Sequence, residues 1–322
     1  MPKVLIIRFS SIGDIVLTSP VVRNLKQQKA DFEVHFLTKK IYASLIEHNP
    51  YVDKAFYLED NLKDVITELK EEQYDYIIDL HKNLRSLKVK TALKAKSYSF
   101  NKLNIEKWLL VNFKWNKMPA IHIVDRYMET LKELGVINDQ KGLDFFIPEN
   151  RSFDFSSLPL LFKEGYVAFA IGGQHGTKKL PTHKIAELCQ KIKRPVILLG
   201  GKEDMEGAEK VISLLPPGTC SKTLNLTGKL SLFESASLVR DSQAVVTHDT
   251  GLMHIAAAFK KKVYSIWGNT VPELGMYPYK TEHVLIQNNN LSCRPCSKIG
   301  YDQCPKKHFK CMEDLTFDDI NL

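Results

Sequence analysis

The chain lacks long apolar runs and long basic runs. No apolar stretch among its 322 residues reaches the roughly 20 residues that a membrane-spanning helix needs. The first residues, Met1–Arg8, become polar too soon for a secretory signal peptide. We therefore expect a cytoplasmic protein. No Lys/Arg run is long enough for a nucleic-acid-binding arm, because Lys260–Lys262 is more simply the cationic end of a helix. We expect no nucleic-acid partner.

Cysteines are few, and the phosphate-binding loop of NTPases is missing. Four of the six cysteines lie between Cys293 and Cys311 and the other two are scattered, which does not fit a secreted disulfide framework. The spacing G-x-x-x-x-G-K-[ST] is absent, which counts against an NTPase.

The composition, 44% hydrophobic and 25% charged, is that of a folded globular protein, and the chain is long enough for two domains of about 150 residues. The net charge of +8 suits an anionic substrate, an anionic membrane surface or nucleic acid, and does not choose between them.

Short apolar strands alternate with helices along the chain. The N-terminal half predicts strands at 3–8, 32–37, 55–58 and 76–80, and helices at 15–28, 41–48, 62–70 and 122–134. The C-terminal half predicts strands at 166–171, 195–199, 244–247 and 263–267, and helices at 182–193, 203–215, 232–239 and after Gly251. This alternation indicates an α/β fold of two Rossmann-like, doubly wound parallel sheets facing each other across a cleft. The polar, turn-rich stretch 148–159 divides the chain into domains 1–155 and 156–322.

The stretch 94–117 is basic and aromatic, with Trp108, Phe113 and Trp115. Our favoured interpretation is a helix that packs these aromatic side chains into the core. The alternative is an amphipathic surface that faces a membrane or a lipid-linked acceptor.

Asp14 follows the first predicted strand, in the loop that leaves the open edge of the sheet. A carboxylate there can accept a proton from a hydroxyl nucleophile. Alternatively, Asp14 or Ser11 caps the first helix, and the two roles are compatible. Gly13 would let a substrate approach the backbone.

The segment His248–His254 turns a buried strand sharply into a helix. Asp249 or Thr250 can cap this helix, and Gly251 keeps its first turn free of a side chain. Free N–H groups at a helix start form a ready site for a phosphate or diphosphate. The alternative is an ordinary capped helix in which His248 and His254 are hydrogen-bonded polar residues.

Two glycine-rich loops follow other strands of the same half. The loop from Gly172-Gly173 to Lys178-Lys179 combines a flexible backbone with ammonium groups, as a diphosphate requires. In the loop Gly200–Asp204, the acidic residue could hold ribose hydroxyls, although a helix start attracts acids in any case. Either loop alone is weak evidence, but three phosphate-binding elements at strand carboxyl ends are considerably stronger.

The C-terminal cysteines have the spacing C-x2-C-x7-C-x6-C, with His308 nearby. The residue types and the first spacing are those of a structural zinc site, while the later spacings are irregular. Zinc, a reduced Cys-rich packing motif and a disulfide-capable motif all remain open. The residues concerned are Cys293, Cys296, Cys304 and Cys311.

Taken together, these segments resemble glycosyltransferase family 9, the ADP-heptose:lipopolysaccharide heptosyltransferases. The resemblance is carried by Ile6–Asp14 (IIRFSSIGD), Lys178–Pro181 and Asp249–His254, and it includes Asp79, Arg85-Ser86, 124–127 and the Cys-rich tail of the heptosyltransferase II type. It implies a GT-B fold, an inverting mechanism, and neither a metal nor another cofactor in the chemistry. Leu180 departs from the family, whose members often have tryptophan there, and the short tail after Cys311 limits how much chain can cross back onto the N-terminal half.

The resemblance also implies residue roles. Asp14 would be the general base, and Asp204 would bind the adenosine ribose. The donor diphosphate would be bound by Lys178, Asp249, Thr250, Gly251, Leu252 and His254, with Gly172 and Gly173 allowing its approach. For the acceptor we expect Ser10, Ser11 and Gly13, together with the cations Arg8, Lys82, Arg85 and Arg126.

The expected activity is transfer of heptose, or a related sugar, from an ADP-sugar to a lipopolysaccharide core or a similar lipid-linked acceptor. We expect a monomer whose partners are this nucleotide-sugar donor and this saccharide acceptor, with peripheral contact to the inner face of the inner membrane. The rival hypotheses are a sugar-nucleotide epimerase of the same fold and a non-catalytic nucleotide-binding protein.

Overall fold

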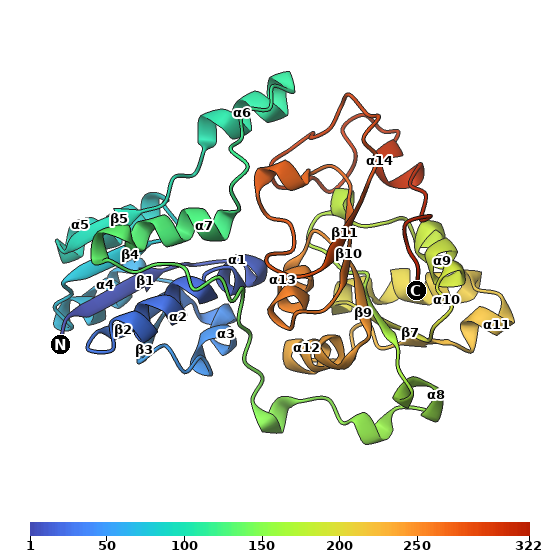
Figure 1. The fold of residues 1–322 in the computed structure, drawn as a ribbon, viewed down its shortest axis with the longest axis horizontal. Helices are drawn as coiled ribbons and strands as arrows, with labels where there is room; N and C mark the ends of the chain where they lie inside the picture. The colour runs from blue at the N-terminus through green and yellow to red at the C-terminus, as the bar shows by residue number, and fades with distance from the viewer. The chain divides into compact units, whose positions relative to one another are not determined.

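The computed structural model describes all 322 residues, which divide into two compact units (Figure 1). The first unit contains residues 1–102 and 121–146, and the second contains 103–120 and 147–322. Each unit is built on one parallel sheet, so the predicted α/β class is confirmed. The division differs in detail from a single boundary after residue 155, because 103–120 group with the second unit and the chain enters that unit again at residue 147.

The sheet of the first unit has five strands in the order β3-β2-β1-β4-β5. These strands are β1 (Lys3–Ile7), β2 (Glu33–Lys39), β3 (Lys54–Leu58), β4 (Tyr76–Asp79) and β5 (Lys96–Ser99). The helices of this unit are α1 (Ile12–Val16), α2 (Ser19–Gln28), α3 (Ser44–Glu47), α4 (Leu62–Glu71), α5 (Leu84–Leu93) and α7 (Ile123–Met128), the last continued by the 3₁₀ turn η2 (Glu129–Leu134). The central strand β1 is apolar and buried because helices cover both faces of a doubly wound sheet.

The single helix predicted over 15–28 is wrong. Two helices, α1 and α2, occupy this stretch, and a turn at Leu17 and Thr18 separates them. Pro20 lies in the first turn of α2. Because proline has no N–H, it is compatible with the first turn of a helix but not with the interior of a continuous one.

The sheet of the second unit has six strands in the order β11-β10-β9-β6-β7-β8. They are β6 (Val167–Ala170), β7 (Val196–Leu199), β8 (Thr223–Asn225), β9 (Ala244–His248), β10 (Val263–Trp267) and β11 (His283–Gln287). The helices are α6 (Asn104–Phe113), α8 (Leu160–Lys163), α9 (Thr182–Lys191), α10 (Met205–Leu214), α11 (Pro217–Cys220), α12 (Leu232–Asp241), α13 (Gly251–Ala258) and α14 (Lys310–Glu313). Short 3₁₀ turns include η5 (Gly176–Lys178), η6 (Lys202–Asp204) and η7 (Pro272–Leu274).

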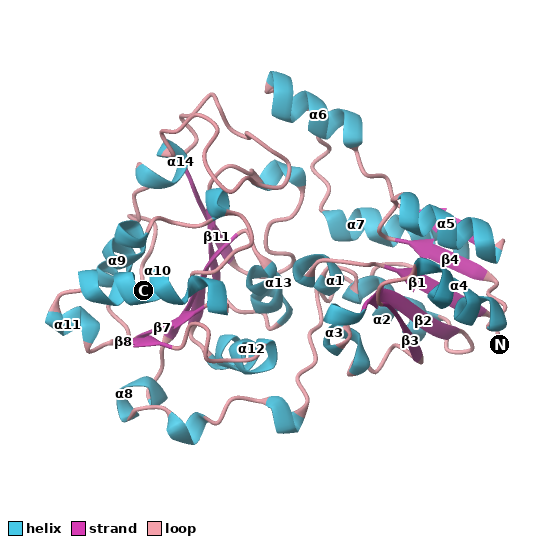
Figure 2. Cartoon of the chain, turned by 180° about the vertical axis from the view of Figure 1, so that it is seen from behind, coloured by secondary structure: helices cyan, strands magenta, loops and turns pink.

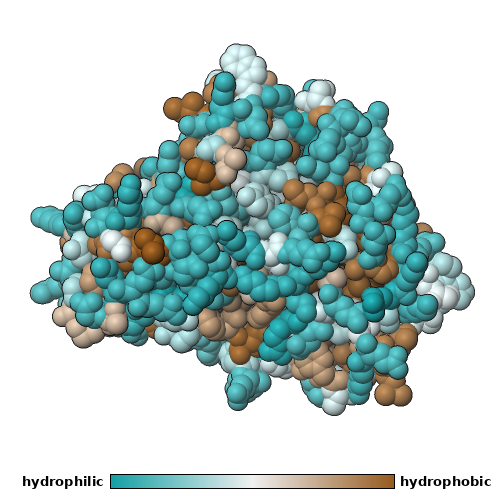
Figure 3. All heavy atoms as spheres, in the orientation of Figure 1, coloured by the Kyte–Doolittle hydropathy of each residue, from teal (hydrophilic) through white to brown (hydrophobic).

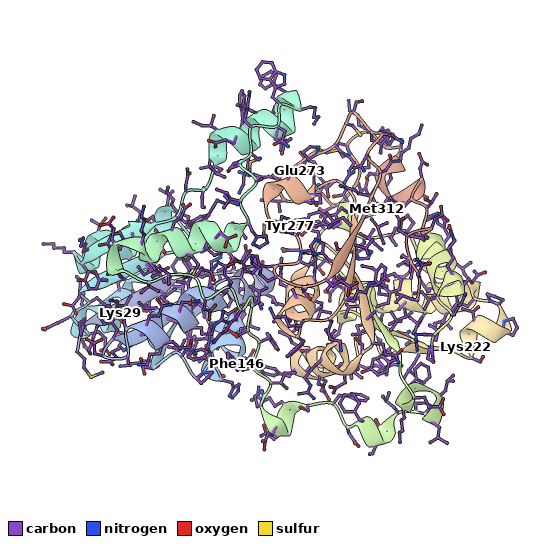
Figure 4. The ribbon with its side chains drawn as sticks, in the orientation of Figure 1. Lys29, Phe146, Lys222, Glu273, Tyr277 and Met312 are labelled. Atoms are coloured by element: carbon purple, nitrogen blue, oxygen red, sulfur yellow. The ribbon has the colours of Figure 1, made fainter.

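A separate apolar core lies on each face of this second sheet, and helices pack over both (Figure 2). Residues alternate between the cores along β6: Val167 and Phe169 belong to one, and Ala168 to the other. The C-terminal helix α14 completes the first of these cores with Met312, which is fully buried (Figure 4). Strands buried on both faces read as continuous apolar runs, which is why β6, β7 and β9 were predictable.

Three strands were not predicted: β5, β8 and β11. Each lies at the edge of its sheet and carries partly exposed residues. An edge strand is only partly covered, so it does not need an apolar residue at each position. Its sequence therefore lacks the continuous apolar run from which a buried strand is predicted.

Strand order reverses between β1 and β4 in the first unit and between β6 and β9 in the second. In an open parallel sheet, the loops that leave the strands at such a switch point diverge and leave room for a ligand. The loops at these points are 8–11 and 80–83 in the first unit, and 171–181 and 249–250 in the second, and each leads into the next helix. No helix is both long and apolar enough to pass through a membrane.

The favoured interpretation of the basic aromatic stretch was wrong. Helix α6 and the residues after it expose their aromatic side chains instead of burying them: Trp108 is 55% exposed, Phe113 50% and Trp115 61%. In this helix only Leu110 is buried. Helical spacing of apolar residues shows that a helix has a non-polar face, but not which medium that face meets.

Candidate active site

An ion pair joins the two loops at the switch point of the second unit. The Nζ atom of Lys178 lies 2.6 Å from Oδ2 of Asp249 and also donates to the carbonyl oxygen of Asp249 at 3.1 Å. Thr270, in the loop after β10, donates its hydroxyl to the same Asp249 oxygen at 2.9 Å. Two residues predicted separately for the donor site are therefore in direct contact. Asp249 holds the ammonium of Lys178 at the carboxyl edge of the sheet.

The start of α13 has no side-chain cap. The prediction that Asp249 or Thr250 caps this helix is wrong, because Thr250 makes no capping hydrogen bond and the Asp249 carboxylate is bound to Lys178 and Thr270. Gly251 and Leu252 open the helix and are partly exposed. An uncapped helix start presents N–H donors and the positive end of the helix dipole, which together suit an anion. His254, by contrast, is buried within α13.

Two glycines permit the close approach of the loop after β6. A Cβ atom on Gly172 would lie 2.4 Å from Oδ2 of Asp204, so a side chain does not fit there. A Cβ atom on Gly173 would lie 3.2 Å from Cγ2 of Thr250. The predicted loop and the predicted helix start are thus adjacent, as strand order β9-β6 requires.

Lys179 points to a different partner from its neighbour Lys178. Its Nζ atom lies 3.0 Å from Oδ1 of Asp204, and the other oxygen of Asp204 accepts the N–H of Gly201 at 3.0 Å. Asp204 is buried and closes the loop after β7 onto the loop after β6. Its carboxylate is thus already bonded at the position for which a ribose contact was predicted.

His248 is a positioning residue that the sequence did not distinguish. It ends β9, is fully buried, and its Nε2 atom accepts the N–H of Leu180 at 3.0 Å. Its Nδ1 atom lies 3.5 Å from the carbonyl oxygen of Gly172. Burial lowers the pKa of His248 to about 4, so the ring is neutral at pH 7. The neutral ring ties both ends of the Lys178 loop to the strand that precedes α13.

The C-terminal segment braces the same loop from another direction. Thr177, next to Lys178, exchanges three hydrogen bonds with the backbone of Tyr301. Arg294 is buried and donates to the carbonyl oxygens of Trp267, Gly268, Thr270 and Asn288 and to the side chain of Gln287. The Cys-rich tail is therefore part of the scaffold of this site.

The four cysteines of this tail are free thiols. Cys293 Sγ lies 3.9 Å from Nε2 of His308, and Cys296 Sγ lies 3.1 Å from the carbonyl oxygen of Cys293. Burial and the neighbouring cysteines raise the pKa of Cys296 to about 11. The one set of three His, Cys, Asp or Glu side chains whose ligand atoms all lie within 4.8 Å of one another is Glu33, His35 and Glu72, in the first unit. Zinc at the cysteines remains a hypothesis.

In the first unit, Asp14 is held by two neighbours in the loop after β1. Its Oδ1 atom lies 2.6 Å from Arg8, and its Oδ2 atom accepts the hydroxyl of Ser11 at 2.9 Å and the N–H of Ser11 at 3.2 Å. Burial would raise the pKa of Asp14, but the Arg8 guanidinium and the Ser11 donors hold it below its ordinary value. The carboxylate is ionised at pH 7, and 21% of the side chain is exposed.

The four cations predicted for the acceptor fall into two classes. Arg8 and Arg126 are buried. Arg8 donates to the carbonyl oxygens of Ser10 and Leu80 and to the Tyr127 hydroxyl, and Arg126 donates to the carbonyl oxygen of Asn101. Lys82 and Arg85 are exposed at the carboxyl end of β4. Since Arg8 also pairs with Asp14, its contacts are those of a residue that positions the carboxylate.

Several polar residues at these edges were missed or given no role. Asp79 accepts the N–H groups of His81 and Lys82 and the hydroxyl of Ser86, and so shapes the loop after β4. Asn269, after β10, is 1% exposed, and neither polar atom of its side chain has a hydrogen-bond partner in the chain. An amide left unpaired in the interior is costly, so Asn269 is a candidate contact for a ligand. The only sequence signal was the position of each residue at or close to the end of a strand.

Comparison with known proteins gives one consistent result. The family model for glycosyltransferase family 9 (heptosyltransferase) matches residues 63–308. Lipooligosaccharide heptosyltransferase 2 of Haemophilus influenzae is 26% identical over an alignment of 292 residues, with 84% of this chain and 84% of that one covered. The structure of Escherichia coli ADP-heptose lps heptosyltransferase II shares the fold with a TM-score of 0.68 at 19% identity, over 97% of this chain and 98% of that one. The E. coli heptosyltransferase WaaC with ADP has a TM-score of 0.65 at 22% identity, over 88% and 93%.

The buried neutral state of His248 predicts a specific dependence of stability on pH. Between an unfolded pKa near 6.5 and the folded value of about 4, the unfolded chain binds the proton more tightly. The free energy of unfolding should therefore fall as the pH drops from 7 to 4, with a contribution of about 3 kcal/mol from this residue. His248→Gln, which retains an acceptor for the N–H of Leu180, should lose this contribution. Urea unfolding followed by circular dichroism at several pH values measures it.

His183→Gln is the matched control, because the His183 side chain is 58% exposed. It should change the unfolding free energy by no more than about 0.5 kcal/mol at any of these pH values. An unchanged acid dependence in His248→Gln would show that folding does not lower the pKa of His248.

Proposed function

This chain belongs to glycosyltransferase family 9, the heptosyltransferases, and we propose that it transfers a heptose or a related sugar from an ADP-sugar to a lipopolysaccharide core or a similar lipid-linked acceptor. The observation that carries the proposal is the Lys178–Asp249 ion pair beside the uncapped start of α13. Relatives named as lipopolysaccharide heptosyltransferases, and a structure of the same fold with ADP, support the choice of donor and acceptor.

The second unit is proposed to bind the donor. Its diphosphate would accept hydrogen bonds from Lys178 and from the N–H groups of Gly251 and Leu252, with Thr250 beside it. Gly172 and Gly173 leave no side chain in the path of the phosphates. The ribose role proposed for Asp204 requires its carboxylate to be shared with Lys179 and Gly201.

The first unit is proposed to bind the acceptor, whose hydroxyl attacks the anomeric carbon. Asp14 accepts the hydroxyl proton as the new C–O bond forms and the bond from the anomeric carbon to the diphosphate breaks, so the configuration inverts in a single displacement. The Arg8 ion pair makes Asp14 a weak base. The proton must therefore move late, once bonding to carbon has made the attacking oxygen acidic. The phosphorylated acceptor core would meet the exposed cations Lys82 and Arg85.

No metal is needed for the proposed step. The leaving ADP gains negative charge as the bond breaks, and Lys178 with the helix N–H groups supplies fixed positive charge where that charge develops. We further propose that the protein acts as a monomer at the cytoplasmic face of the inner membrane, where a lipid-linked acceptor would be found.

The first test is a donor panel of ADP- and UDP-sugars with a lipopolysaccharide-core acceptor, read by product mass. ADP-heptose should add one heptose to the acceptor. Asp14→Asn should bind ADP with nearly unchanged affinity and lower the turnover by on the order of a hundredfold or more, because it removes the base but not the donor contacts.

Two results would count against this proposal. Full activity of Asp14→Asn would show that Asp14 is not the general base. Conversion of an ADP-sugar to its epimer in the absence of acceptor would identify a sugar-nucleotide epimerase instead.

A second prediction separates the two neighbouring lysines. Lys178→Ala should weaken ADP binding by roughly 1.5–3 kcal/mol, about ten- to a hundredfold, because it removes a charge-assisted contact and leaves Asp249 unpaired beside the diphosphate. It should also lower the maximal rate, since the charge on the diphosphate grows in the transition state. Lys179→Ala should have a much smaller effect on binding, because Lys179 pairs with Asp204. Calorimetry with ADP and rates at saturating donor measure both effects. If both variants lost ADP affinity equally, the effect of Lys178 would come from the positive charge of the loop as a whole and not from a specific contact with the diphosphate.

A third prediction concerns metal removal. Transfer should persist in excess EDTA, because the leaving group is stabilised by Lys178 and the helix N–H groups. Immediate loss of activity that magnesium or manganese restores would contradict this account. A slow loss accompanied by unfolding would instead indicate a structural zinc at the cysteines of the C-terminal tail.

A further inference from the structure

Helix α6 and the residues after it carry an exposed cluster of apolar side chains, here called the aromatic tip. Its members are Ile105, Trp108, Phe113 and Trp115, each at least half exposed. The rings contact one another: the centroids of Trp108 and Phe113 are 5.1 Å apart, and those of Phe113 and Trp115 are 5.6 Å apart. In Figure 3, a few brown and pale side chains lie among hydrophilic ones at the top of the view, where Figure 1 places α6. A contiguous exposed apolar cluster of this kind marks a surface that meets another partner.

The tip is fixed to the second unit rather than loose. The buried side chain of Leu110 packs against Val271 and Leu274, on either side of Glu273 in the turn η7 (Figure 4). Lys114 donates from Nζ to the carbonyl oxygen of Pro295 at 2.7 Å. The segment that carries the exposed aromatic rings is therefore packed against the second unit, so the rings are not exposed merely because the segment lacks contacts.

The charge around the tip has one predominant sign. Residues 102–117 contain four lysines and one glutamate, a net charge of +3. Lysine side chains beside exposed tryptophans can keep their ammonium groups in water while their methylene chains lie against an apolar layer. Tryptophan and lysine together are typical of surfaces that lie in the interfacial region of a membrane.

We propose that the aromatic tip docks the protein onto an anionic lipid bilayer, with the rings in the headgroup region and the lysines on lipid phosphates. This inference rests on the proposed function, since it explains how the enzyme would reach a lipid-linked acceptor. A second copy of the chain is a poorer occupant. Like charges on two tips repel, and four side chains are few beside the roughly 20–30 residues that each partner contributes to a standard interface.

The positions of the tryptophans allow a direct test. The chain has three tryptophans, and Trp267 is 1% exposed, with its indole N–H bonded to Ser265. Vesicles of phosphatidylglycerol and phosphatidylcholine with brominated acyl chains should quench Trp108 and Trp115 but leave Trp267 unaffected. The double variant W108F/W115F should bind these vesicles as the native chain does, but without quenching. The variant W108S/W115S should bind at least tenfold more weakly, measured by co-sedimentation.

Charge and matched controls complete the vesicle assay. K107E/K117E should also weaken binding to anionic vesicles by tenfold or more, and added salt should weaken native binding. K63E/K70E, at exposed positions on α4, makes the same change in net charge and should lose much less. L160S/L161S removes exposed leucines from α8 and should bind normally.

Three outcomes would overturn the proposal: no quenching of the native chain, full vesicle binding by W108S/W115S, or a native dimer in sedimentation equilibrium that W108S/W115S dissociates.

A water-soluble, delipidated acceptor separates this inference from the proposed function. On that acceptor W108S/W115S should keep its turnover and KM within about twofold, and a large rise in KM would assign the tip to the saccharide instead. The vesicle assay contains no substrate, so it stands even if the activity proposal fails.

Discussion

The contact between Lys178 and Asp249 determines the geometry at the carboxyl edge of the second sheet. These residues follow the adjacent strands β6 and β9, and their pairing fixes the distance between loops that the sheet alone leaves free. The Lys178 side chain is the more exposed partner, at 17% against 10% for Asp249. The ammonium is thus slightly more accessible than the carboxylate that holds it, which suits contact with an anion. A cation placed in advance does not have to be ordered when charge develops on a ligand.

The first unit also has an ion pair at its switch point, but there the relative exposure of the acid and the base is reversed. Arg8 and Asp14 follow β1 at the switch point with β4, but here the carboxylate is the more exposed partner, at 21% against 10% for Arg8. An exposed carboxylate suits proton transfer, whereas an exposed ammonium suits the binding of an anion. The five strands of the first sheet have the same order as five of the six in the second, so the different roles proposed for the two pairs depend on which member of each pair is more exposed.

How much the sequence predicts depends on whether a feature has a local signal. The buried strands were predicted because covering by helices on both faces requires unbroken apolar runs such as Val196–Leu199. The edge strand Lys96–Ser99 has no such run. The positions of Asp14, Lys178 and Asp249 were predicted because strand ends in a parallel sheet share one edge. The residues that they contact were not predicted, because a sequence shows which side chains are charged but not which are buried. Arg8 and Lys82 are both cations that follow a strand, yet Arg8 is buried and Lys82 is exposed. For the same reason, the helical pattern of α6 could not show that its rings face outward.

The C-terminal segment illustrates the same limit at a larger scale. From the sequence it is a cysteine motif, but in the fold its most connected residue is Arg294, between Cys293 and Cys296, which binds carbonyl oxygens of the loop after β10. The segment also bonds to Thr177 beside Lys178 and accepts Lys114 from α6. One stretch of irregular chain thus supports both the Lys178 loop and the aromatic tip within the second unit. A buried guanidinium satisfied by this many backbone acceptors costs much to displace. The cysteines therefore lie in a segment whose position is already determined by hydrogen bonds, whether or not their thiols hold an ion.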